Sequence, residues 1–201
     1  KKIRGVVNDI YIREFPIKED WSFLVASSAL TLTERYNTGT VTATTGGTNV
    51  VFSTDVTITS AMTGRRLRVD GNDYIYNVTF ESATSLTISP PFSGTQNVTS
   101  VGYDVFAPFY PLAGDFDRFL KDQGVTKYTG GKRAQIPEKV PQEFDRDYSS
   151  TPQDLPTYCR LFGTDTNGRT LVEFNPPPKS AISLPYDYIR RVQSMRETTA
   201  G

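Results

Sequence analysis

The sequence predicts an α+β protein. It combines N-terminal helices, a short central helix and a C-terminal β-hairpin/strand unit with an inserted all-β domain, either a small sandwich or an open barrel. Three observations predict this class: unbroken alternation of apolar and polar residues over 39–106, helical spacing of apolar residues over 3–30, and a hairpin signal at Asn167-Gly168. We expect residues 1–38 and 107–201 to form one discontinuous core around the insertion.

The N-terminal part is predicted to hold two helices. In residues 3–14, five apolar side chains recur at helical spacing: Ile3, Val6, Val7, Ile10 and Tyr11. A second helix is predicted from about residue 19 to 30, because Glu19 and Asp20 suit the positive end of a helix dipole and Trp21 shares a face with Leu24. The two helices are placed to form a hairpin.

The inserted domain is predicted to contain six short strands. Alternating residues mark them: Val41/Ala43, Val56/Ile58, Leu67/Val69, Tyr74/Tyr76/Val78, Leu86/Ile88 and Val101/Tyr103/Val105. Gly46-Gly47, Asp70-Gly71 and Pro90-Pro91 supply turn chemistry between strands. Residues 60–64 begin with Ser and end with Gly, which predicts a single helical turn.

The chain after the insertion is predicted to begin with a short helix over residues 110–120, capped by Asp115. Residues 125–155 are rich in Gly, Pro and Ser and indicate a long loop with at most one short helix at 141–148. Two strands, 155–162 and 169–174, flank the Asn-Gly turn. A third strand can follow at 182–192.

The composition excludes several kinds of chemistry. The chain contains no histidine, which removes the usual general base and the commonest zinc ligand. Cys159 is the only cysteine, so no internal disulfide forms and a reducing compartment is favoured. Basic and acidic residues number 22 each, which argues against non-specific attraction to nucleic acid or membrane. No apolar run approaches the ~20 residues of a membrane span. We expect no enzymatic activity, cofactor or metal.

Four basic residues gather in the predicted loop: Lys127, Lys132, Arg133 and Lys139. Such a group can face a phosphate backbone, although no aromatic residues are interleaved with it. Arg66 and Arg68 lie on the strand face opposite Leu67, where a solvated position is expected.

Several segments together resemble the head-to-tail adaptor (connector, or neck) proteins of tailed bacteriophages. The resemblance is carried by Val7-Asn8-Asp9-Ile10-Tyr11, Trp21, Tyr110-Pro-Leu-Ala-Gly-Asp-Phe-Asp-Arg118, Leu155-Pro-Thr-Tyr158, Leu171-Val-Glu-Phe-Asn-Pro-Pro-Pro178 and Leu184-Pro-Tyr-Asp-Tyr-Ile-Arg-Arg191. The block 39–106, with Ala61-Met-Thr-Gly-Arg65, resembles an insertion common in such virion proteins.

This resemblance implies a homo-oligomeric, dodecameric ring in the virion neck, assembled in the host cytoplasm. Its implied partners are the portal protein, a tail or nozzle protein and the genomic DNA that passes through the channel. No membrane is involved. Trp21 and Tyr110 are the candidate interface aromatics, and the four basic loop residues are candidates for facing the DNA channel or the portal.

Two alternatives stay open. The β-block could be a receptor- or glycan-binding module of a phage tail or bacterial surface protein, with Tyr74 and Tyr76 on one exposed sheet face. The chain could also be a carboxylate-dependent enzyme such as a glycosidase, which needs two carboxyl groups ~5–10 Å apart in one cleft. The pairs Asp115/Asp117 and Asp145/Asp147 are the candidates, although a cap and solvated positions explain them better.

Overall fold

The computed structural model describes residues 6–7, 10, 21–120, 124–149 and 151–192 of the 201-residue chain. The described residues form fifteen strands, two single 3-10 turns and the short helix α3 (Pro141–Arg146). The protein is therefore mostly β, and the expectation of an α+β fold with N-terminal helices is wrong.

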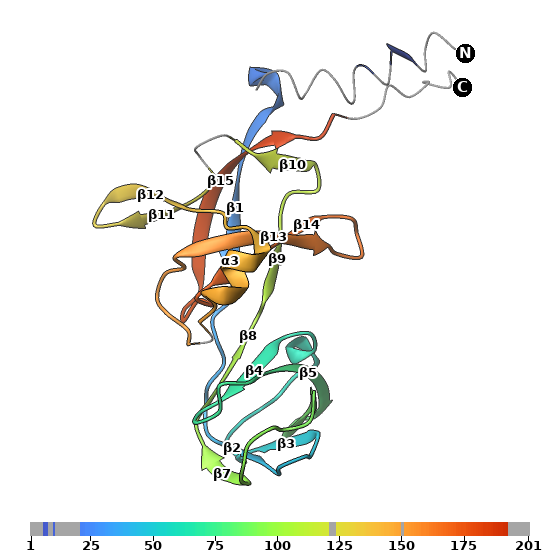
Figure 1. The fold of residues 1–201 in the computed structure, drawn as a ribbon, viewed down its shortest axis with the longest axis vertical. Helices are drawn as coiled ribbons and strands as arrows, with labels where there is room; N and C mark the ends of the chain where they lie inside the picture. The colour runs from blue at the N-terminus through green and yellow to red at the C-terminus, as the bar shows by residue number, and fades with distance from the viewer. Residues whose placement is uncertain (1–5, 8–9, 11–20, 121–123, 150, 193–201) are drawn as a thin grey trace.

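The molecule is elongated and has two lobes, a curled sheet at one end and a sandwich of two sheets at the other (Figure 1). The chain enters the curled sheet after β1 and leaves it through β8, so two connections join the lobes (Figure 1). Each lobe has its own cluster of buried apolar side chains.

The first lobe is a seven-stranded antiparallel sheet with the order β7-β2-β3-β6-β5-β4-β8. Its strands are β2 (Val41–Ala43), β3 (Asn49–Phe52), β4 (Arg66–Val69), β5 (Ile75–Ser82), β6 (Ser85–Ser89), β7 (Val98–Val101) and β8 (Tyr103–Phe106). The two border strands β7 and β8 are separated only by Gly102. This continuous stretch pairs with β2 at one border and with β4 at the other, so the sheet curls into a small barrel.

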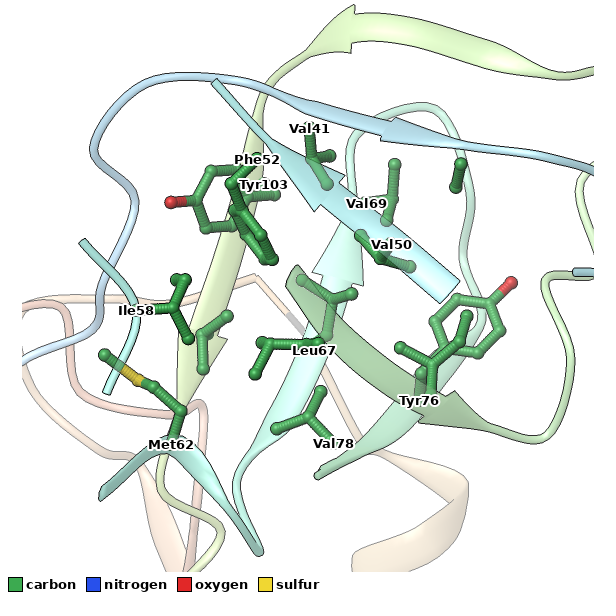
Figure 2. Close-up of a cluster of buried hydrophobic side chains, with 14 of the residues drawn as sticks. Val41, Val50, Phe52, Ile58, Met62, Leu67, Val69, Tyr76, Val78 and Tyr103 are labelled. Carbon is green, nitrogen blue, oxygen red and sulfur yellow. The ribbon is translucent and has the colours of Figure 1, made fainter. Parts of the chain in front are cut away.

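The barrel interior is filled by buried apolar side chains, ten of which are labelled in Figure 2. Most belong to the predicted alternating pattern, but Val50 and Phe52 come from β3, a strand that was not predicted, and Met62 lies outside the pattern as well. Val56 and Ile58, expected in a strand, lie instead in irregular backbone, yet both side chains are buried. The expected helical turn is present as a 3-10 turn at Ser60–Met62. The alternating pattern therefore predicted correctly that these two side chains are buried, although the strand itself did not form.

The second lobe packs a five-stranded sheet, ordered β1-β15-β11-β12 with β10 also on β15, against a three-stranded sheet ordered β13-β14-β9. Their strands are β1 (Val25–Leu32), β9 (Phe109–Pro111), β10 (Phe116–Phe119), β11 (Val125–Thr129), β12 (Lys132–Ile136), β13 (Tyr158–Thr164), β14 (Thr170–Asn175) and β15 (Ile182–Arg190). Leu32, Tyr186 and Phe174 contribute to the shared core.

The second predicted helix is a strand. After a 3-10 turn at Ser22–Leu24, all eight residues of β1 pair with β15. Leu30 and Leu32 are buried while Ala29 and Thr31 are exposed, which is a period of two. The helix propensity of Ala and Leu is small compared with the stabilisation that this eight-residue ladder provides. The first predicted helix lies outside the described residues except for Val6, Val7 and Ile10, which are exposed.

The central helix expected over residues 110–120 is also absent, because β9 and β10 occupy this stretch. Asp115 accordingly caps no helix and accepts a hydrogen bond from the Tyr188 hydroxyl at 2.8 Å. Aromatic side chains such as Phe116 pack against β15 instead, which favours a strand that can share its ladder.

The region 125–155 is more ordered than a loop. It forms the hairpin β11–β12 around Gly130-Gly131, where both glycines have positive φ as a two-residue turn requires. The short helix expected at 141–148 is confirmed as α3. The hairpin β13–β14 is confirmed with its turn at Asp165–Gly168. The third strand is confirmed as β15, but it pairs with β1, β10 and β11.

Candidate functional site

The aspartate pairs considered for acid–base catalysis are all engaged in ion pairs. In the carboxylate pairs named above, each aspartate lies within ion-pair distance of a cation: Asp115 with Arg190, Asp117 with Arg118, Asp145 with Arg160, and Asp147 with Lys139 and Arg146. Hydrogen bonds from Arg146 and Lys139 lower the pKa of Asp147 to about 2. A carboxylate held ionised in this way is a poor general acid near neutral pH.

A cavity of about 200 Å³ lies beside β11, β12 and β13, and Glu138 and Cys159 line it. Burial raises the pKa of the Cys159 thiol to about 12, and burial also raises the pKa of Glu138. The thiolate that nucleophilic catalysis needs is therefore suppressed at neutral pH. Among the residues that the structure describes, no cluster of potential metal ligands occurs. No helix in the same residues is long and apolar enough to cross a membrane.

A buried ionic clasp holds the two lobes together. Glu173 on β14 is 1% exposed and accepts from two guanidinium groups, Arg66 of the barrel at 2.6 Å and Arg160 of β13 at 2.7 Å. Arg160 also reaches Asp145 of α3 at 2.7 Å. Because Arg66 lies on β4, this chain of charges joins the barrel to the sandwich. The expected solvated position of Arg66 is thus wrong.

Aromatic rings surround the clasp. Phe109 and Phe162 stack with centroids 4.6 Å apart, and Arg66 lies 5.3 Å from the centroid of Phe109. Arg160 lies 4.4 Å from the centroid of Phe144. These rings exclude water from the ion pairs and attract the cations through their π-faces. The clasp contacts both lobes, and its Glu173 carboxylate is occupied by the two guanidinium groups.

A second ion-pair cluster supports the same junction. Asp104 on β8 is 4% exposed and accepts from Arg35 at 2.6 Å and from Arg68 at 3.2 Å. Arg35 belongs to the connection between β1 and β2, so this cluster holds the first connection against the barrel. Arg68, like Arg66, is therefore engaged in ion pairs instead of lying on a solvated face.

The four basic candidates do not gather into one patch. Lys127 donates to the Pro156 carbonyl at 2.7 Å, Arg133 pairs with Asp187 at 2.7 Å, and Lys139 pairs with Asp147 at 2.6 Å. Lys127, Lys132 and Arg133 share the hairpin β11–β12, while Lys139 lies beyond it and contacts the ring of Tyr158. Lys132 is exposed next to the glycine turn.

The two aromatic interface candidates have different positions. Tyr110 is 4% exposed, and its hydroxyl accepts from the Thr33 amide at 3.3 Å. Burial raises the pKa of Tyr110 to about 12, so this residue belongs to the sandwich core. Trp21 is half-buried just before the 3-10 turn Ser22–Leu24, and its ring centroid lies 6.3 Å from that of Phe23, which is 56% exposed.

The proposed glycan-binding pair is split between two environments. Tyr76 is fully buried inside the barrel, where its hydroxyl accepts from the Ser93 amide and from Asn72, both at 3.0 Å. Tyr74 is 48% exposed on the outside. The aromatic patch that the glycan-binding alternative relied on is therefore not formed by these residues.

The most prominent surface feature is one that the sequence interpretation missed. The hairpin β11–β12 extends away from the sandwich in Figure 1, and all residues from Tyr128 to Gln135 are exposed. Tyr128 is 62% exposed, the highest value among the large apolar side chains that the structure describes. The Gly130-Gly131 pair between two five-residue segments is a hairpin signal that could have revealed this arm.

A long uncovered strand lies at the other border of the same sheet. β1 pairs with β15 along its full length, and no described strand pairs with its other side. The five-stranded sheet therefore has β1 at one border and β12 at the opposite border. This arrangement offers two different strand edges to neighbouring molecules.

Comparison with known proteins gives no match to a family model, to a curated protein or to a solved structure.

Proposed function

We propose that the chain is a structural virion subunit, a head-to-tail adaptor that assembles as a ring between the portal and the tail and extends the DNA channel. The observation that carries this proposal is the projecting arm β11–β12. Its eight exposed residues and its Tyr128 ring lie beyond the sandwich core. A two-stranded hairpin is only marginally stable in water by itself, so an arm of this kind gains stability when it docks on a neighbour.

The junction between the two lobes suits a stiff subunit. The Arg66–Glu173–Arg160 clasp joins the barrel to the sandwich, and the Asp104 cluster holds the connection after β1 against the barrel. Residues held by buried ion pairs and by two separate cores resist bending better than lobes joined by a linker alone. A ring that connects a capsid to a tail requires this stiffness.

The paired ends of β1 and β15 also favour assembly at one pole. Val25 at the start of β1 pairs with Ile189 near the end of β15. The start of β1 and the end of β15 therefore lie side by side at the end of the sandwich away from the barrel (Figure 1). One pole of the subunit is thus available to a portal or tail protein, while the sheet edges are available to neighbouring subunits.

The charge balance is compatible with a DNA channel. The 22 basic and 22 acidic residues cancel, and three of the four basic candidates are engaged within the chain. A channel wall that held DNA through many free cations would slow its passage, because each phosphate contact adds salt-dependent affinity. We therefore assign the hairpin to subunit contacts, with Lys132 as the basic candidate left for the portal or DNA.

Native mass spectrometry and electron microscopy of the purified full chain test this function, alone and mixed with a portal ring. The expected result is a closed ring of many copies seated on the portal. A chain that stays monomeric and also fails to bind the portal ring would exclude the adaptor function. Binding of the monomer to a glycan array in that experiment would instead favour a surface-binding module.

A further inference from the structure

We propose that the free edge of β1 receives β12 of a second copy, so that the five-stranded sheets of successive subunits join edge to edge. This inference rests on the proposed ring and names its contact.

The edge of β1 is unusually open. Its eight residues, Val25–Leu32, pair with β15 without a register shift. Their side chains are small or apolar, and the strand contains no charged residue and no proline. Natural proteins protect exposed edges with lysine, proline, bulges or a short strand length, and β1 has none of these. An edge of this kind is suited to pairing with another strand.

The strand directions allow the sheet to continue. Each neighbouring pair on the path β1-β15-β11-β12 is antiparallel. Because this path contains an even number of strands, β12 runs opposite to β1. When the sheet of a second copy is placed beside the first in the same orientation, β12 and the next β1 are again antiparallel. The same contact can then repeat from copy to copy, as a head-to-tail ring requires.

On β12, the backbone N–H and C=O groups that do not pair with β11 point toward the free edge of the sheet. In a hairpin with a two-residue turn, the flanking pair Thr129–Lys132 exchanges hydrogen bonds, and bonded and non-bonded pairs then alternate along the ladder. Arg133 and Gln135 fall at the non-bonded positions. Their N–H and C=O groups therefore point away from β11, toward the free edge.

Charges across the sheet favour this partner. On the exposed face, Arg133 of β12 pairs with Asp187 of β15 at 2.7 Å, and Asp187 in turn accepts from Ser27 of β1 at 2.5 Å. Asp187 lies on β15, two strands from β12 in the sheet order, and the Arg133 side chain crosses β11 to reach it, donating on the way to the Thr126 hydroxyl at 3.1 Å. In the joined sheet, Asp187 of the next copy also lies two strands from Arg133. The edge at β1 then brings this aspartate, and no lysine or arginine of β1 itself, toward the cations of β12. A contact between two copies of β12 would instead combine their cations in one ladder.

The test compares two substitutions at one position in the full chain. Gln135→Pro removes an outward N–H while the ladder inside the hairpin keeps its hydrogen bonds. Gln135→Ala removes the side chain and keeps the N–H. We expect Gln135→Pro to lower the yield of rings at least ~10-fold, the factor that ~1.4 kcal/mol per contact produces, and Gln135→Ala to assemble like the unmodified chain. Circular dichroism of both variants checks that the fold is retained.

Disulfide trapping is the second measurement. Two variants, Ser27→Cys with Gln135→Cys and Ala29→Cys with Gln135→Cys, place thiols on the exposed face of both edges in two registers. Cys159 is buried and does not compete. A ladder of crosslinked dimers, trimers and larger species from either variant supports the contact. Dimers only, already formed by Ser27→Cys alone, would show β1 paired with β1 and overturn it.

The outcomes separate the two proposals. Rings that form equally well with Gln135→Pro, without crosslinks in either double variant, overturn the edge contact and leave the adaptor function in place. A chain that never assembles on a portal, yet gives a crosslinked ladder at high concentration, supports the edge contact and excludes the adaptor function.

Discussion

Removal of the Glu173 carboxylate tests whether the buried clasp holds the two lobes together. Glu173→Ala would leave Arg66 and Arg160 facing each other, with side chains only 20% and 10% exposed. Breaking a buried ion pair by removing one partner costs about 3–5 kcal/mol. Arg160 keeps Asp145 as a partner at 2.7 Å, and Arg66 keeps a 3.4 Å contact to the Tyr148 hydroxyl. We therefore expect a loss near the lower value, about 3 kcal/mol.

Thermal unfolding followed by circular dichroism measures this loss. For a chain of this length, 1 kcal/mol lowers Tm by about 2–4 °C, so the expected decrease is about 6–12 °C. The barrel and the sandwich have separate cores. The variant is therefore expected to broaden or split the transition, because the lobes lose a shared interaction.

Two further variants serve as controls, one at an exposed ion pair and one in which the clasp is replaced by apolar side chains. Asp154→Ala removes a surface ion pair whose atoms are 3.9 Å apart and whose side chains are 50% and 84% exposed, and it should change stability by less than about 0.5 kcal/mol. Glu173→Leu combined with Arg66→Met and Arg160→Met replaces the clasp with apolar groups and should recover most of the loss. If Glu173→Ala and Asp154→Ala shifted Tm equally, the desolvated clasp would be refuted.

Four other predictions concern buried side chains of the two cores. Tyr76→Phe should cost about 1–3 kcal/mol in urea unfolding, because the Ser93 amide inside the barrel loses its acceptor; an unchanged midpoint would contradict this. Phe92→Ala, at a residue 2% exposed, should cost about 3–5 kcal/mol through the cavity it leaves, measured in the same assay. Cys159 should react with a thiol reagent at pH 8 about 1,000-fold more slowly in the folded chain than in urea, because its pKa is raised from 9.0 to about 12. The same shift stabilises the folded state below pH 9 and loses this effect as pH rises toward 12, so alkaline unfolding should begin in that interval.

Local pattern was reliable where a residue's environment depended only on its near neighbours. The period-two alternation of Leu67/Val69 and of Leu86/Ile88 predicted their strands, because one face of each is buried in the barrel. The Asn167-Gly168 turn and the Pro141 start of α3 were equally visible, since both depend on local backbone preference.

The same reasoning failed where a distant partner decided the outcome. Val25–Leu32 has helix-forming Ala and Leu residues, yet its pairing with β15 made it a strand. The helix expected around Asp115 became β10 for the same reason. Propensity differences of less than about 1 kcal/mol per residue cannot compete with an eight-residue ladder and a shared core.

The sequence by itself determined that this protein has a β-rich block over residues 39–106, no histidine chemistry and a neutral total charge, because composition and period need no partner. Only the tertiary structure decided that the block closes as a barrel, that Arg66 meets Glu173 across 107 positions, and that β1 and β12 form opposite borders of one sheet. Such arrangements depend on contacts between segments far apart in the chain, and no local pattern specifies which distant segment a strand or a charge will meet.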